Sequence, residues 1–130
     1  MKFVGIDYGL KKIGIAVSEG NLAEPLMVMN VKDEDDAINK LTNLIKSFGN
    51  VNEIVIGISE GEMASRIRKF ARRLQHGTSS KVKFRDETLS TYEAQKLSIE
   101  SGKKQKKRRA MKDAYAAAII LQNYLDAQIK

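Results

Sequence analysis

Two apolar runs at the start of the chain flank a short polar turn, and this hairpin pattern constrains the fold more than any other feature. The runs cover residues 3–8 and 13–17, and the link GLKK between them has the length and the glycine of a tight hairpin. Asp7 lies near the end of the first run, where a buried carboxylate must be paired, hydrogen-bonded or bound to a metal ion. It could equally cap the turn by accepting hydrogen bonds from the amides of Gly9 and Leu10.

The net charge of +7 comes from one segment of the chain. Seven of the 23 lysines and arginines lie in the segment 103–112 with no acidic residue among them, and the remaining 16 balance the 16 acidic residues. The seven are Lys103, Lys104, Lys106, Lys107, Arg108, Arg109 and Lys112. Such a patch indicates a polyanionic partner, with nucleic acid as the first choice. The alternative is a solvated basic loop that has no partner.

Length and composition limit the class of protein. A chain of 130 residues is predicted to form one domain, residues 1–130. Its longest apolar run, 114–121, is far shorter than the roughly 18 residues of a membrane span, and its first strand begins too close to Met1 for a leader peptide. A cytoplasmic protein without a membrane partner is therefore expected. With no cysteine and a single histidine, a metal site would need oxygen ligands, which favour Mg²⁺ or Mn²⁺.

Hydrophobic periodicity predicts an α/β protein with a mixed central sheet. The segment 53–58 is apolar almost throughout, which is typical of a central strand covered on both faces. Residues 32–36 are predicted to open a helix that runs to about 48, with apolar residues at helical spacing over 37–48. The other expected elements are strands at 25–31 and 81–86, a helix from the capping residue Ser59 to about 76, and helices at 90–101 and from about 109 onward. The predicted order is β-β-β-α-β-α-β-α-α, with helices on the faces of the sheet.

Two groups of acidic residues have a structural explanation. The acids at 33–36 are predicted to form the N-cap and the acidic first turn of a helix, which suits the helix dipole better than a cation site. Ser59 and Glu62 have the spacing of a capping box at the start of the next helix.

The apolar pattern does not explain four other acidic residues. Asp7 ends the first strand, Asp86 and Glu87 end the last strand, and Asp113 lies early in the last helix beside its alanines. Alanines would let that helix lie close to the sheet, and Asp7 would end near the late pair if the first and fourth strands are neighbours. Converging carboxylates repel unless a cation lies between them, and oxygen ligands beside a basic patch suit two-metal phosphodiester hydrolysis. Unrelated surface acids are the alternative.

Four segments in this order carry a resemblance to a known family: GIDYGLKKIGIAVS, VIGI with an arginine-rich helix after it, RDETLST, and KKRRAMKDAYAAAIILQNYL. They cover essentially the whole chain and resemble the YqgF/RuvX family, which is related to the RuvC-type Holliday junction resolvases. The resemblance implies an RNase H-like three-layer fold and a divalent-metal nuclease. The activity it implies is maturation of the 5′ end of pre-16S rRNA in ribosome biogenesis, or Holliday junction resolution in DNA repair. A resolvase would need two active sites and hence a homodimer.

The resemblance also implies which residues form the site. Asp7, Glu87 and Asp113 match the acids of the family and are expected to hold two Mg²⁺ or Mn²⁺ ions. Asp86 stays a second candidate for the middle position, because alternation puts it on the apolar face of its strand and Glu87 on the other. Nucleic-acid contacts are expected from the turn, the late strand and the basic segment, namely Lys11, Lys12, Arg85, Lys103, Lys104, Lys106, Lys107, Arg108 and Arg109.

Two departures from the family pattern concern the substrate. The family usually has an arginine after the acid pair and a proline-containing loop after the VIGI strand, and here Thr88 and the loop 59–61 take those places. Without the arginine a planar bidentate phosphate donor is missing, so a nucleic-acid-binding protein without catalysis is a competing hypothesis. The opening segment also resembles the phosphate hairpin of actin-like ATPases, but those need two large lobes that 130 residues cannot supply.

Overall fold

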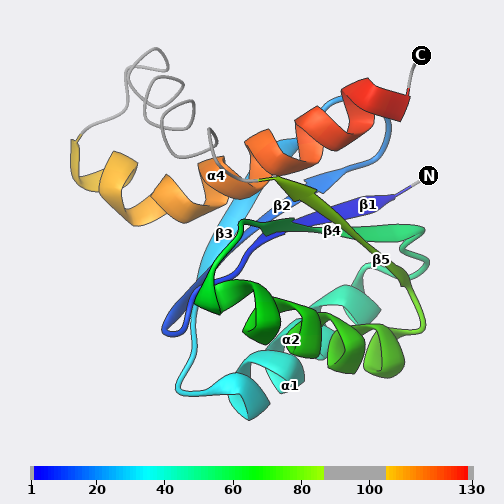
Figure 1. Ribbon diagram of the computed structural model, residues 1–130. Helices are drawn as coiled ribbons and strands as arrows, with labels where there is room; N and C mark the ends of the chain where they lie inside the picture. The colour runs from blue at the N-terminus through cyan, green and yellow to red at the C-terminus, as the bar shows by residue number, and fades with distance from the viewer. Residues whose placement is uncertain (1, 87–104, 129–130) are drawn as a thin grey trace.

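A mixed sheet with helices on both faces forms the protein (Figure 1). The structure is a computed structural model that describes residues 2–86 and 105–128. In chain order the elements are β1 (Phe3–Asp7), β2 (Lys12–Ser18), β3 (Glu24–Asn30), α1 (Glu34–Ser47), β4 (Glu53–Ile58), α2 (Glu62–Thr78), β5 (Lys81–Asp86) and α4 (Gln105–Gln128). The helix predicted at 90–101 lies outside the described residues.

The five strands lie in the order β3-β2-β1-β4-β5. β2 is antiparallel to β1 and β3, while β4 is parallel to β1 and β5. The predicted mixed sheet is therefore confirmed, and the first and fourth strands are neighbours. Because β1, β4 and β5 run in the same direction, Asp7, Ile58 and Asp86 end at the same edge of the sheet.

Alternation along the strands divides the apolar residues between two cores. Ile6, Ile15 and Ile56 belong to the core under α1 and α2, whereas Ala16 and Val55 belong to the core under α4. Figure 1 shows the same three layers, with α1 and α2 together on one face of the sheet and α4 on the other. The predicted three-layer fold is thus observed, and β4 is the interior strand that its apolar sequence indicated.

Helix α4 lies close to the sheet because both surfaces carry small residues. A Cβ atom added at Gly5 would lie 2.8 Å from the carbonyl oxygen of Ala117 and 2.7 Å from the Cβ of Leu121. Ala114 and Ala117 are fully buried in this contact. The alanine-rich sequence of the helix and the glycines of β1 and β2 therefore fit together and fix the height of α4 above the sheet.

The helix starts differ in part from the predictions. Asp33 caps α1 as expected, since its side chain accepts a hydrogen bond of 2.8 Å from the amide of Asp36. The capping box at Ser59 was a wrong prediction, because α2 begins after Gly61, whose φ of 117° is accessible to glycine, and no side chain caps it. Helix α4 begins at Gln105, earlier than predicted, since lysine and arginine are good helix formers. None of the helices among the described residues is both long and apolar enough to cross a membrane.

A partly buried hydrogen bond joins α4 to β4 and gives the stability a pH dependence. The hydroxyl of Tyr124 donates a hydrogen bond of 2.9 Å to Oε1 of Glu53. Burial, and secondly this hydrogen bond, raises the pKa of Tyr124 to about 12. Since an unfolded tyrosine has a pKa of about 10, the bond stabilises the fold below pH 10, and this contribution is lost as the pH rises toward 12.

We therefore expect Tyr124→Phe to lower the free energy of unfolding by about 1 kcal/mol at neutral pH. The stability of the parent should fall more steeply than that of the variant as the pH rises from 10 to 12. Urea unfolding at neutral pH and across this alkaline range measures both effects. Equal stability of the two proteins at neutral pH would contradict a role for the hydrogen bond.

Candidate active site

Asp7 and Asp113 come together at the end of β1. Asp7 pairs across the hairpin with Gly14, which places the two Cα atoms within about 5.5 Å of each other. The backbone of Asp113 lies directly on Gly14, since a Cβ there would overlap the carbonyl group of Asp113. Both aspartates are half-buried. Asp7 also shares its strand face with Gly5, which touches α4, so the two residues lie on the same side of the sheet.

This pair of carboxylates fits part of a divalent-cation site. Carboxylate oxygens are the ligands that Mg²⁺ and Mn²⁺ prefer. In 2–86 and 105–128 no group of three acidic, histidine or cysteine residues is placed to hold a metal ion. Glu87, the third predicted ligand, lies outside the described residues. Two of the three predicted ligands, Asp7 and Asp113, therefore lie among the described residues.

Asp86, the second candidate for the middle position, lies on the other face of the sheet. It follows Val82 and Phe84 at alternate positions of β5, and it lines a hollow together with Ala64 and Arg68 of α2. Asp7 and Asp113 lie on the opposite face, under α4. The end of β5 is also separated from β1 by β4. Asp86 is thus at the correct edge of the sheet but on the face away from the other two acids.

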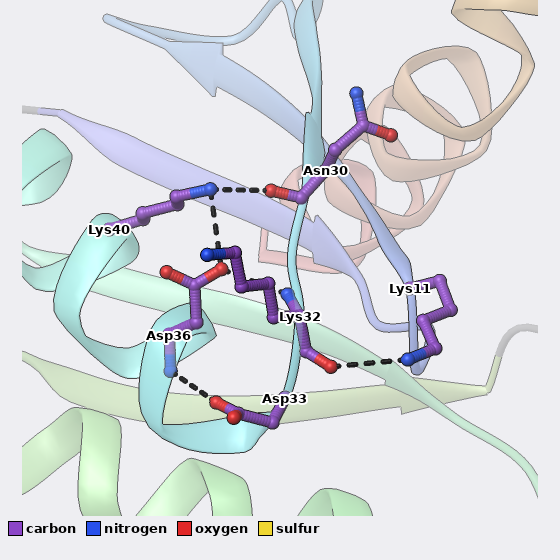
Figure 2. A network of polar contacts seen from close by, with 6 residues as sticks. All are labelled: Lys11, Asn30, Lys32, Asp33, Asp36 and Lys40. Carbon is purple, nitrogen blue, oxygen red and sulfur yellow. Dashed lines mark hydrogen bonds and ion pairs between the residues drawn. The ribbon is translucent and has the colours of Figure 1, made fainter.

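The two lysines of the hairpin turn have different surroundings. Lys12 alternates with Gly14, so it lies on the face that carries Asp113, and it is exposed. Lys11 instead donates a hydrogen bond of 3.2 Å from its ammonium group to the carbonyl of Lys32, just before α1 (Figure 2). Of the two predicted phosphate contacts, Lys12 therefore lies nearer the acidic pair. Arg85 is half-buried near the end of β5.

The acidic run before and within α1 is occupied by local contacts, as Figure 2 shows. Asp36 accepts a hydrogen bond of 2.9 Å from the amide of Lys32 and pairs with Lys40 at 3.3 Å. The backbone hydrogen bond is the main cause that lowers the pKa of Asp36. Glu34 and Asp35 pair with Arg73 of α2, at 2.6 and 2.8 Å. The interpretation of this run as the N-cap and acidic first turn of a helix is confirmed.

The basic segment falls partly within α4. Lys103 and Lys104 lie outside the described residues, whereas Lys106, Lys107, Arg108 and Arg109 belong to the first turns of the helix. Lys112 follows on the same helix, directly before Asp113, and is exposed. The helix therefore carries basic residues up to the acidic pair.

A hollow beside this edge of the sheet was not predicted. It brings together Arg68, from the arginine-rich helix, and Phe84, from the strand at 81–86. In the structure both line a hollow of about 610 Å³ between α2 and β5. Only the placement of β5 as an edge strand beside α2 reveals it, so no signal in the sequence could have found it.

Fold and site together define the class of the protein. A five-stranded mixed sheet in this order, with an acid at the end of β1 and a second on the helix across it, is the RNase H-like arrangement. Two solved structures share the fold. The Fowlpox virus resolvase, in a complex with substrate Holliday junction DNA, matches with a TM-score of 0.68 and 16% identity over 100% of both chains. Thermus thermophilus RuvC matches with a TM-score of 0.60 and 13% identity over 99% of this chain and 96% of its own.

The family follows from sequence comparison. Residues 1–127 match the family model described as "RuvX: Holliday junction resolvase". A protein of Dictyoglomus turgidum named "Putative pre-16S rRNA nuclease" is 38% identical over 98% of this chain and 95% of its own length. A protein of the same name from Halothermothrix orenii is 37% identical over 100% of this chain and 98% of its own. The chain belongs to the RuvX family, a family of nucleases, as the opening and closing segments of the sequence indicated.

Proposed function

We propose that the protein is a divalent-metal-dependent nuclease whose carboxylates Asp7, Glu87 and Asp113 hold Mg²⁺ or Mn²⁺. The observation that supports this most is the contact between the backbone of Asp113 and Gly14, the strand partner of Asp7. It brings two half-buried carboxylates to one face at the edge where β1, β4 and β5 end. Because Asp86 lies on the opposite face, strand alternation favours Glu87 as the third ligand.

The chemistry of the site follows from these groups. A bound divalent cation supplies a nucleophile at neutral pH and stabilises the leaving oxygen in phosphodiester hydrolysis. The carboxylates of the chain fix the positions of the cations. Lys12 and Lys112, both exposed beside the acidic pair, neutralise substrate phosphates, and the basic first turns of α4 hold the backbone of the nucleic acid without reading its sequence.

We propose the 5′ end of pre-16S rRNA as the substrate. The two relatives of this name described above are 37–38% identical and match nearly all of the chain, whereas the two resolvase structures share the fold at 13–16% identity. Such an enzyme would work in the cytoplasm, where ribosomes are assembled. The second candidate is Holliday junction resolution, favoured by the description of the family and by the match to the Fowlpox virus resolvase. That activity would need a homodimer, because a junction is cut at two sites.

A metal titration with two substrates tests the proposal. We expect Mg²⁺ or Mn²⁺ to produce cleavage of a labelled pre-16S rRNA fragment and a chelator to abolish it, while a four-way DNA junction stays intact. Cleavage of the junction alone would select the resolvase. Binding of both substrates without cleavage at any metal concentration would contradict the nuclease and leave a nucleic-acid-binding protein. Thr88→Arg, which restores the donor that the family usually has, would then be the first variant to assay.

A further inference from the structure

A groove between α2 and the edge strand β5 is not used by the acidic pair. Two hollows, of about 610 and 160 Å³, lie along it and share Arg68 and Phe84 in their linings. The larger reaches the sheet edge at Asp86, and the smaller continues along the strand to Val82. The groove therefore leads away from the edge at which Asp7 lies.

Phe84 is an aromatic side chain that the fold leaves open in this groove. Its residue is 40% exposed, although Val82 before it on the same face packs against the core. An exposed aromatic ring offers a flat surface on which a nucleobase stacks, whatever the base. Bases inside a duplex are already stacked on each other, so this kind of contact selects an unpaired nucleotide.

The charges along the groove fit a phosphate backbone. Arg68 and Arg72 are exposed one helical turn apart on α2, and both line the smaller hollow beside Phe84. Among the described residues neither arginine forms an ion pair, whereas the next residue, Arg73, pairs with Glu34. Guanidinium groups are planar bidentate donors and are suited to phosphate oxygens.

Among the described residues, the carboxylates that line the groove lie at one end of it. Glu60 and Asp86 line the larger hollow, at the edge of the sheet, and no acidic residue of 2–86 or 105–128 lines the smaller hollow. The part of the groove that carries Phe84, Arg68 and Arg72 is therefore apolar and basic, which is the combination found in single-strand binding sites.

We propose that this groove binds an unpaired stretch of the nucleic-acid substrate, with one base stacked on Phe84 and phosphates on Arg68 and Arg72. The proposal rests on the proposed nuclease function and deepens it. It requires a substrate with a single-stranded flank beside the cleavage site, as opposed to a continuous duplex. An oligonucleotide of either sugar type satisfies the same chemistry, so RNA and DNA probes are both used in the test.

Binding without metal tests the groove separately from catalysis. A labelled single-stranded oligonucleotide of about 12 nucleotides, as RNA or DNA, is titrated with the full chain in a chelator, and fluorescence anisotropy gives the affinity. We expect Phe84→Leu to weaken binding about tenfold, while Phe84→Tyr keeps the stacking surface and the affinity. A blunt duplex of equal length should bind parent and Phe84→Leu equally.

The arginines are tested through the salt dependence of binding. The double variant Arg68→Gln/Arg72→Gln should reduce the slope of log affinity against log salt by about 1.4, since two phosphate contacts of a single strand are lost. Arg66→Gln is the matched control, because Arg66 is exposed on the same helix and does not line the groove. It should leave the affinity within about twofold of the parent.

Equal affinity of Phe84→Leu and the parent for the single strand would overturn the proposal. An equal loss of single-strand and duplex binding in Phe84→Leu would also overturn it. So would a parent protein that forms a dimer, if Phe84→Leu dissociates this dimer without changing oligonucleotide binding, because the groove would then bind a second copy of the chain. Thermal unfolding checks that the variants are folded. These outcomes are independent of the metal titration. If Phe84→Leu binds the single strand like the parent and still cleaves the substrate, the groove proposal is contradicted and the nuclease proposal is not.

Discussion

Asp113→Asn is expected to reduce metal-dependent cleavage about a thousandfold while leaving substrate binding nearly unchanged. Asparagine keeps the size of the side chain but removes the charge that would hold a divalent cation. A catalytic cation contributes several kcal/mol of transition-state stabilisation, and each 1.36 kcal/mol corresponds to a factor of ten in rate. Because Asp113 lies against Gly14, the partner of Asp7, Asp7→Asn should have an effect of the same size. Cleavage rates under single-turnover conditions and anisotropy in a chelator separate the chemical step from binding.

Two control variants and a variant of the third proposed ligand make this result specific to the site. Asp126→Asn removes an exposed carboxylate from the same helix, where it accepts a hydrogen bond from Gln122, and should cleave like the parent. Asp86→Asn should also retain cleavage, because Asp86 lies on the other face of the sheet, whereas Glu87→Gln should lose it. Full activity in Asp113→Asn would contradict the proposed site. Loss of activity in Asp86→Asn and retention of activity in Glu87→Gln would mean that Asp86, and not Glu87, is the third metal ligand. The proposed metal chemistry would be unaffected.

The layers of the fold were predictable because the apolar pattern reports burial directly. In β2, Ile13 and Ile15 alternate with Gly14 and Ala16, and the isoleucines belong to one core while Ala16 belongs to the other. The unbroken apolar run of β4 indicated an interior strand, which is observed. The start of α2 was not predictable in the same way. Ser59 and Glu62 have the spacing of a capping box, yet the helix begins after Gly61. The spacing of a capping box is only a local signal, and the backbone turns into the helix at Gly61, whose positive φ favours glycine.

The site was predictable only in part, because its assembly depends on tertiary contacts. The alanines around Asp113 indicated a helix close to the sheet, and this is observed. The contact between the backbone of Asp113 and Gly14 was not predicted. A glycine in a strand shows that a close approach is possible, but only the structure shows which helix makes it. For the same reason the sequence could not decide whether Asp86 or Glu87 is the third ligand. Strand alternation predicts opposite faces for the two acids, but only the position of α4 shows which face carries Asp7.

Gly14→Ala is the second substitution with a large expected effect, and it acts on the position of Asp113 without changing any charge. The added Cβ would overlap the backbone carbonyl of Asp113, so helix α4 has to move away from β2. Overpacking of this kind costs about 1–3 kcal/mol of stability or more. A shift of about 1 Å at the site can reduce the rate about a hundredfold. We therefore expect both a lower midpoint of urea unfolding and a rate that falls further than the unfolded fraction explains.

Two other glycines separate these two effects. Gly20→Ala adds a methyl group at a position where, among the described residues, no atom beyond its chain neighbours lies within 4 Å, and it should leave both stability and rate unchanged. Gly5→Ala also crowds α4, at Ala117 and Leu121, but one helical turn and more beyond Asp113. It should destabilise the protein with a smaller loss of rate per folded molecule. If the cleavage rate per folded molecule falls equally in Gly5→Ala and Gly14→Ala, Gly14 has no specific role in positioning Asp113 and matters for stability alone. A larger loss in Gly14→Ala means that the close approach of α4 to the hairpin, which the small residues on both sides make possible, sets the geometry of the acidic pair.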